Sequence, residues 1–84
     1  MEFELVTPAK SLARFNAEEV ILPGGEGSFG VLPGHQPLLS NLQPGQVRVR
    51  KEGGEELTYN TGNGFVDVNQ TKVTVLTDHA EVAE

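Results

Sequence analysis

The chain has 84 residues, no cysteine and a formal net charge of −6 at pH 7. Its length allows one domain with a modest core, and the lack of cysteine excludes disulfides and thiolate metal sites. The acidic balance disfavours nucleic-acid binding, which requires a basic face, and no apolar run approaches the roughly twenty residues that cross a bilayer.

Apolar residues alternate with polar ones along most of the chain. Phe3 and Leu5 alternate with glutamates near the N-terminus, and Val47 and Val49 alternate with arginines in the middle. A period of two is typical of strands with one buried face. It predicts strands near residues 2–7, 11–16, 18–22, 28–32, 46–51, 56–61, 64–68 and 71–77.

Two segments do not follow this period clearly. Residues 37–42 (PLLSNL) fit either a short strand or an irregular apolar connection. Residues 77–84 are rich in Ala and Glu and favour the start of a helix, with Asp78 as its N-cap.

Turn signals separate the predicted strands. Pro-Gly pairs at 23–24, 33–34 and 44–45 predict chain reversals, because Pro fixes φ and Gly tolerates positive φ at the next position. Short strands with turn signals every 8–12 residues are typical of a β-sandwich or barrel. The sequence therefore predicts an all-β fold of mainly antiparallel strands.

The stretch GEGSFG at residues 25–30 matches G-x-G-x-x-G, a spacing found in nucleotide-binding loops. A dinucleotide site needs a helix after the third glycine, and Pro33 would end a helix within one turn. A kinase lid needs a lysine on the next strand, but the next basic residue after Gly30, apart from His35, is Arg48. We therefore expect no nucleotide at this loop.

No other residues have the spacing of a catalytic or metal site. His35 lies in a Pro-Gly-His turn and is interpreted as a turn residue. The basic residues Arg48, Arg50 and Lys51 are interpreted as one solvated strand face, with a docking surface for an acidic partner as the alternative. Segment 23–45 keeps many apolar residues between its turns, which favours a contact surface.

Residues 27–49 (GSFGVLPGHQPLLSNLQPGQVRV) resemble the signature of the epsilon subunit of bacterial F-type ATP synthase. The matching positions are Gly27, Gly30, Val31, Pro33, Gly34, His35, Pro37, Leu38, Leu39, Pro44 and Gly45. The stretch FELVTPAKSL is similar to the opening strand of that family, and GNGFVDVNQTKVTVLTDHAE is similar to its last two strands. The resemblance covers the whole chain without a large gap.

The resemblance implies a flattened β-sandwich or barrel of about ten short strands, with residues 1–84 as one domain that lacks the family's C-terminal helical hairpin. It implies a noncatalytic rotor subunit in the central stalk, which clamps the gamma subunit to the c ring and couples proton-driven rotation to ATP synthesis. Such a subunit is a peripheral membrane protein at the cytoplasmic face of the bacterial cell membrane, attached only through protein partners. No cofactor, metal, small-molecule ligand or nucleic acid is expected.

The resemblance also implies two sets of contact residues. The predicted contacts with the c ring are Ser28, His35, Gln36, Pro37, Leu38, Leu39 and Ser40. The predicted contacts with gamma are Phe65, Val66 and Val68. Many members of the family carry an acidic residue where this chain has Ser28, so the charge for a salt bridge to the ring is missing there.

The competing interpretation is a stand-alone β-sandwich binding module, for example for carbohydrate. One Tyr, four Phe and no Trp offer little material for stacking on sugars.

Overall fold

The computed structural model describes residues 1–83, and these contain nine strands and no helix. The strands are β1 (Glu2–Val6), β2 (Ser11–Gly24), β3 (Gly27–Val31), β4 (Leu38–Leu42), β5 (Gly45–Lys51), β6 (Glu56–Thr61), β7 (Gly64–Val68), β8 (Lys72–Thr77) and β9 (Ala80–Val82). The all-β prediction is confirmed.

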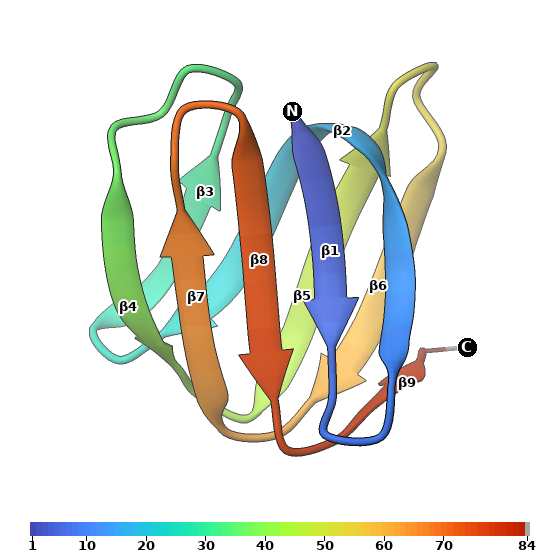
Figure 1. The fold of residues 1–84 in the computed structure, drawn as a ribbon, viewed down its shortest axis with the longest axis vertical. Coiled ribbons are helices and arrows are strands. Elements are labelled where there is room, and N and C mark those ends of the chain that lie inside the picture. The colour runs from blue at the N-terminus through green and yellow to red at the C-terminus, as the bar shows by residue number, and fades with distance from the viewer. Residues whose placement is uncertain (84) are drawn as a thin grey trace.

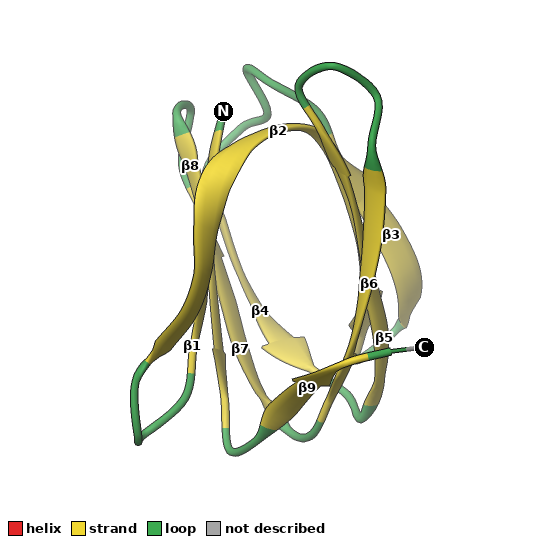
Figure 2. Cartoon of the chain, turned by 90° about the vertical axis from the view of Figure 1, so that its right-hand side faces the viewer, coloured by secondary structure: helices red, strands yellow, loops and turns green. Residues whose placement is uncertain are grey.

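The strands form two facing layers that β2 connects (Figures 1 and 2). One layer holds β1, β8, β7 and β4, and the other holds β3, the second half of β2, β5, β6 and β9. Hydrogen bonding runs in the order β1-β8-β7-β4-β2-β5-β6-β9, and β1 also pairs with β2, so the pairings follow a ring around the molecule. Every pairing is antiparallel except that of β1 with β8.

Strand β2 passes from one layer to the other without a break, so the prediction of separate strands at 11–16 and 18–22 is corrected. Its first part pairs with β1, and from Ala17 onward it pairs with β5. The register with β5 shifts between Ala17 and Glu19. Such a bulge bends a strand and breaks its alternation without ending it, which explains why the sequence pattern indicates two strands.

The core lies between the two layers. Its most deeply buried large side chains are Phe3, Leu5, Leu22, Leu42, Val20, Val31, Val47, Val49, Val66, Val68, Val73 and Val75. The Phe3 ring lies at the centre of an aromatic group, with ring centroids 5.4 Å from Phe15 and 6.3 Å from Tyr59. Burying one such side chain contributes about 1.5–3 kcal/mol. The burial of these alternating apolar side chains is therefore the main source of the stability of the fold.

The segment PLLSNL, for which the sequence left two alternatives open, forms β4 from Leu38 onward. It pairs antiparallel with β7, with Leu38 opposite Val68 and Leu42 opposite Gly64. Its hydrogen bonds to the neighbouring layer are limited to the pair of Gly24 and Leu42, so β3 and β4 diverge and leave an open edge between the layers.

The tail does not form the predicted helix. Residues 80–82 form β9, antiparallel to β6, and Asp78 contacts His79 Nδ1 at 3.0 Å instead of capping a helix. The outer edge of β6 supplies backbone partners, as in the bond from Ala83 N–H to the Thr58 carbonyl (2.9 Å). This tertiary pairing outweighs the helix propensity of Ala and Glu. The last residue of the predicted helix, at position 84, lies outside the described residues.

The Pro-Gly pairs at 33–34 and 44–45 lie where the chain bends between strands. The pair at 23–24 instead forms the end of β2, and the chain reverses at the next two residues, 25–26. The prediction of a chain reversal at 23–24 is therefore corrected. A Cβ atom at Gly24 would lie 2.7 Å from the Phe29 ring. Gly24 is therefore required by close packing against Phe29 rather than by a turn.

Candidate functional site

The glycine-rich stretch 25–30 is a β-hairpin and not a phosphate-binding loop. Gly25 and Glu26 form the turn, and Gly27 begins β3 with φ at +118°, a value that favours glycine. Strand β3 continues to Val31, so the helix that a dinucleotide loop requires does not follow the third glycine.

The loop between β3 and β4 is held by bonds within itself. The backbone N–H of His35 donates to the Leu32 carbonyl (3.1 Å), and Gly34 has φ at +83°. The His35 ring contacts the Gln36 carbonyl through Nδ1 at 2.7 Å. Because a carbonyl accepts only, Nδ1 carries the proton and the ring is tied to its own loop.

The residues predicted to contact the c ring lie along one edge of the molecule. Ser28 is exposed beside the β2–β3 turn, residues 35–37 lie in the loop after β3, and residues 38–40 begin β4. The turn and the loop stand at opposite ends of β3 (Figure 1). The predicted contact residues therefore extend along the whole edge as a stripe and are not gathered at one end of the molecule.

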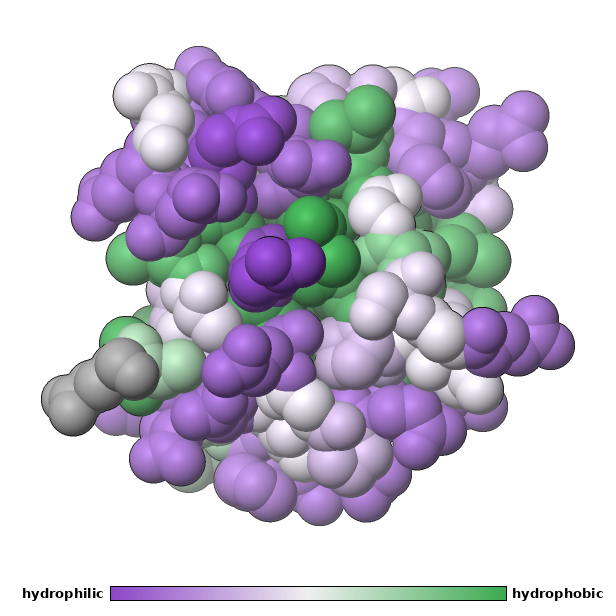
Figure 3. Space-filling model, turned by 180° about the vertical axis from the view of Figure 1, so that it is seen from behind, coloured by the Kyte–Doolittle hydropathy of each residue, from purple (hydrophilic) through white to green (hydrophobic). Residues whose placement is uncertain are grey.

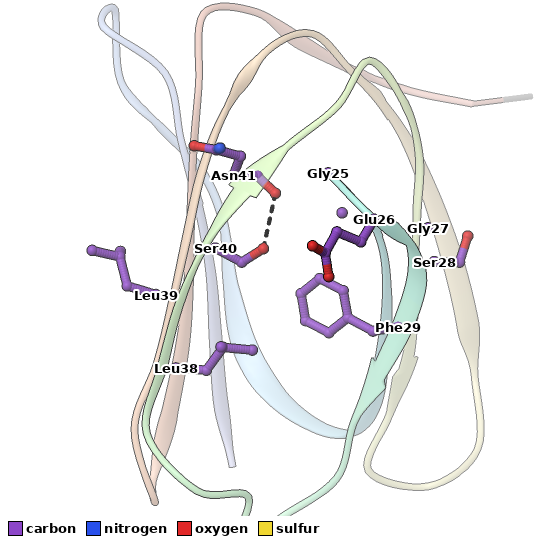
Figure 4. A pocket seen from close by; sticks show the side chains of 10 residues that line it. Gly25, Glu26, Gly27, Ser28, Phe29, Leu38, Leu39, Ser40 and Asn41 are labelled. Atoms are coloured by element: carbon purple, nitrogen blue, oxygen red, sulfur yellow. Dashed lines mark hydrogen bonds between the residues drawn. The ribbon is translucent and has the colours of Figure 1, made fainter.

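Part of this edge encloses a cavity of about 480 Å³ between the β2–β3 hairpin and β4. Its lining residues are Gly24, Gly25, Glu26, Gly27, Ser28, Phe29, Leu38, Leu39, Ser40 and Asn41. Phe29 and Leu38 point toward each other across it, and Leu39 points away (Figure 4). The Ser40 hydroxyl donates to the Asn41 carbonyl at 3.1 Å, so it is already bonded to the strand.

The cavity gathers only part of the predicted stripe. It includes Ser28 and residues 38–40, whereas the loop residues 35–37 do not line it. The side chain of Leu39 is 72% exposed on the outer side of β4. Leu32 and Leu38 are also exposed on this edge (54% and 37%), and a group of exposed apolar side chains, unlike a single one, indicates a contact surface.

The three residues predicted to contact gamma occupy different environments. Phe65 is 54% exposed on the outer face of β7, whereas Val66 and Val68 are fully buried between the layers. Because side chains alternate across a strand, the two valines cannot offer their side chains to a partner. The predicted gamma contact is therefore narrowed to Phe65.

Phe65 belongs to an apolar groove of about 390 Å³ on the outer face of β1, β7 and β8. The groove is lined by Val6, Thr7, Pro8, Gly64, Phe65, Leu76, Thr77 and Asp78. Leu76 stands opposite Phe65 on one side and Val6 on the other. Sequence reasoning missed Leu76 and Val6. Each of them is an apolar residue at a position of its strand where the alternation predicts a polar one. Only the strand register shows that these two positions lie beside Phe65.

Surface ion pairs such as Glu4–Lys72 connect neighbouring strands and lie outside the cavity. A hydrogen bond from Lys72 (2.9 Å), followed by one from the Ser11 hydroxyl (2.9 Å), lowers the pKa of Glu4. Burial, followed by the charge of Glu55, raises the pKa of Tyr59. Within residues 1–83, His, Asp and Glu form no group of three or more that could hold a metal ion.

The described part of the chain contains no helix long and apolar enough to cross a bilayer.

Comparison with known proteins identifies the family. The model of the ATP synthase delta/epsilon chain β-sandwich domain matches residues 1–83. The ATP synthase epsilon chain of Myxococcus xanthus is 47% identical over 93% of this chain and 57% of its own length, and that of Chromohalobacter salexigens is 44% identical over 92% and 55%. The chain thus spans little more than half the length of these relatives.

Solved structures show the same fold. A chain in the structure of the Euglena gracilis mitochondrial ATP synthase, described as OSCP/F1/c-ring in rotational state 1, superposes with a TM-score of 0.85 at 28% identity, over 95% of this chain and 51% of that one. A chain in the central stalk/c-ring structure of the Tetrahymena thermophila mitochondrial ATP synthase has a TM-score of 0.79 at 20% identity, over 96% and 65%. The chain belongs to the family of ATP synthase delta/epsilon chain β-sandwich domains.

Proposed function

We propose that this chain is a noncatalytic rotor domain of the F-type ATP synthase, which clamps the gamma subunit to the c ring. In this role it lies in the central stalk at the cytoplasmic face of the bacterial membrane, as a single domain held there by protein partners. It transmits proton-driven rotation toward ATP synthesis and binds no cofactor. Support comes from curated relatives that are epsilon chains and from fold neighbours in structures that contain F1, the central stalk and the c ring.

The open edge of β3 and β4 is the surface that we assign to the c ring. Leu32 is 54% exposed and Leu39 is 72% exposed along this edge, and Leu38 faces the cavity between the β2–β3 hairpin and β4. Pro33 and Pro37 restrict the connecting loop before binding, which lowers the entropy lost on contact. A clamp under torque needs such a largely pre-formed surface.

The groove around Phe65 is the surface that we assign to gamma. An aromatic side chain that is half exposed in an apolar groove is the usual anchor of a protein interface. The cavity lies on the inner side of β4, whereas the groove lies on the outer face of β1, β7 and β8. Leu39 projects from β4 on that same outer face, one strand away from Phe65. The contacts that we assign to the two partners therefore adjoin. The exposed position of Leu39 is the single observation that carries the proposal most directly.

The proposal is tested with Leu39→Ala and Leu42→Ala, two truncations on the same strand. Leu39→Ala is expected to weaken binding to gamma and the c ring of the same organism about tenfold, with the thermal midpoint of the isolated chain unchanged. Leu42 is only 2% exposed, so Leu42→Ala is expected to cost about 2–5 kcal/mol of stability. His35→Ala should also weaken assembly and leave the domain folded.

Two outcomes would overturn the proposal. If Leu39→Ala unfolds the chain, Leu39 belongs to the core and is not a contact. If the wild-type chain forms no stable complex with gamma and the c ring, the rotor function itself is wrong.

A further inference from the structure

Arg48 stands apart from most of the other basic residues of this acidic chain. The ion pairs that Arg and Lys form within residues 1–83 are Arg14–Glu2, Arg50–Glu18, Arg50–Glu19, Lys51–Glu55 and Lys72–Glu4. Arg48 and Lys10 form no ion pair with any residue of the described range 1–83. The chain has 12 acidic and 6 basic side chains, so the isolation of Arg48 reflects its position and not a shortage of carboxylates.

The register places Arg48 in the middle of the outer face of its layer. Its neighbours Val47 and Val49 point into the core, so Arg48 points outward. Across the strands it stands opposite Ile21 on β2 and Thr58 on β6, and Gly30 on β3 follows Ile21 in the same row. The residues directly opposite Arg48 are uncharged, whereas Glu19 and Glu56 lie opposite Arg50, two residues further along β5. Gly30 carries no side chain and leaves space for a partner to approach.

The surface of this layer has hydrophobic residues across its middle and more polar residues at its ends. Figure 3 views the layer from behind and shows a hydrophobic band that a strongly hydrophilic residue interrupts at its centre, with hydrophilic residues above the band and a mixture of polar residues below it. At one end, Arg50 occupies the carboxylates of Glu18 (3.3 Å) and Glu19 (3.0 Å). Those carboxylates are therefore bonded elsewhere, and the Arg48 guanidinium remains available.

We propose that the outer face of β2, β5 and β6 around Arg48 is a docking surface for a subunit of the same complex that presents a carboxylate ringed by small apolar side chains. The inference rests on the proposed function, because it places the partner in the ATP synthase. A guanidinium binds one carboxylate through two parallel hydrogen bonds. The apolar side chain of Ile21, directly opposite Arg48, shields one side of such a pair from water, which strengthens it.

The charge of the chain favours a protein over a polyanion. A nucleic acid or an anionic membrane is held by several cations acting together. This face offers one cation that no described residue neutralises, on a chain of net charge −6. One such cation is sufficient to bind a single carboxylate on the surface of a partner protein.

The test measures binding of the fluorescently labelled chain to ATP synthase from the same organism from which this subunit has been removed. Arg48→Glu is expected to lower the affinity about thirtyfold or more, because a like charge then faces the partner's carboxylate. Arg48→Gln should lower it less, and the loss should shrink as salt is raised. Lys10→Glu is the matched control, since it makes the same charge change in the β1–β2 turn, and it should bind like the wild type.

Each result decides between the two proposals. If the wild-type chain binds and Arg48→Glu binds equally well with an unchanged thermal midpoint, the docking surface is wrong and the rotor function stands. If Lys10→Glu loses as much affinity as Arg48→Glu, only the overall charge matters, and the specific contact is again wrong. If the wild-type chain does not bind at all, the rotor function is wrong, and the docking surface that rests on it is wrong with it.

Discussion

The two outer faces of the sandwich are built by the same alternation of residues, yet they offer different chemistry. On the face of β1, β8 and β7, Phe65 and Leu76 lie side by side in an apolar groove. On the face of β2, β5 and β6, Arg48 lies between the uncharged Ile21 and Thr58. The alternation fixes which side of a strand is buried, whereas the cross-strand register decides what a partner meets on the other side.

The largest effect is expected at the groove face, from Gly64→Ala. A Cβ atom there would lie 1.8 Å from the Leu76 carbonyl oxygen, which is backbone and cannot move aside. We expect a loss of about 3 kcal/mol in the free energy of unfolding, measured by urea denaturation. The matched control is Gly25→Ala, where the nearest atoms are 3.9 Å away. Equal stability of the two variants would contradict the close approach of β7 and β8.

The sequence predicted the buried side of the strands better than their connections. Phe3, Leu5, Val47 and Val49 were read correctly because burial of one face imposes a strict period of two. The continuous β2 was missed because its bulge near Glu18 breaks that period locally.

The candidate surfaces depend on long-range pairing that a single sequence does not show. Strand β9 replaced a predicted helix because the free edge of β6 is a tertiary feature. Likewise, Leu76 joins Phe65 only through the β7–β8 register. The predicted c-ring contacts from Ser28 to Ser40 remain a prediction, and the sequence did not indicate that Ser28 and residues 38–40 line a cavity while residues 35–37 lie in a loop outside it.

A smaller effect, on binding rather than folding, is expected from Phe65→Ser. The exposed ring contributes to contact and little to the core, so the thermal midpoint should stay unchanged while the affinity for gamma falls about tenfold. Because the groove is apolar, this loss should be nearly independent of salt, in contrast to the loss caused by Arg48→Glu. Binding measured at low and high salt separates the two faces. A similar salt response of both variants would contradict the difference between the faces.

The smallest effect concerns the ion pair of Glu4 and Lys72 beside the groove. The lowered pKa of Glu4 means that its contribution to stability is present near neutral pH and is lost as pH falls through the folded-state pKa, below the range in which a free glutamate titrates. Lys72→Met removes the main cause of the lowered pKa, so the variant should lose less stability on acidification than the wild type. Urea midpoints between about pH 3 and pH 6 measure the difference. Identical pH dependence would show that the pair does not influence folding.

The most direct test of the central claim is site-specific photo-cross-linking in the assembled ATP synthase. A photoreactive side chain is placed at position 39 on the β4 edge or at position 65 in the groove, both of which are exposed. The account predicts a cross-link to a c subunit from position 39 and to gamma from position 65. Cross-links from both positions to one subunit, or from neither position to any subunit, would contradict a clamp that holds two partners at adjoining contact sites.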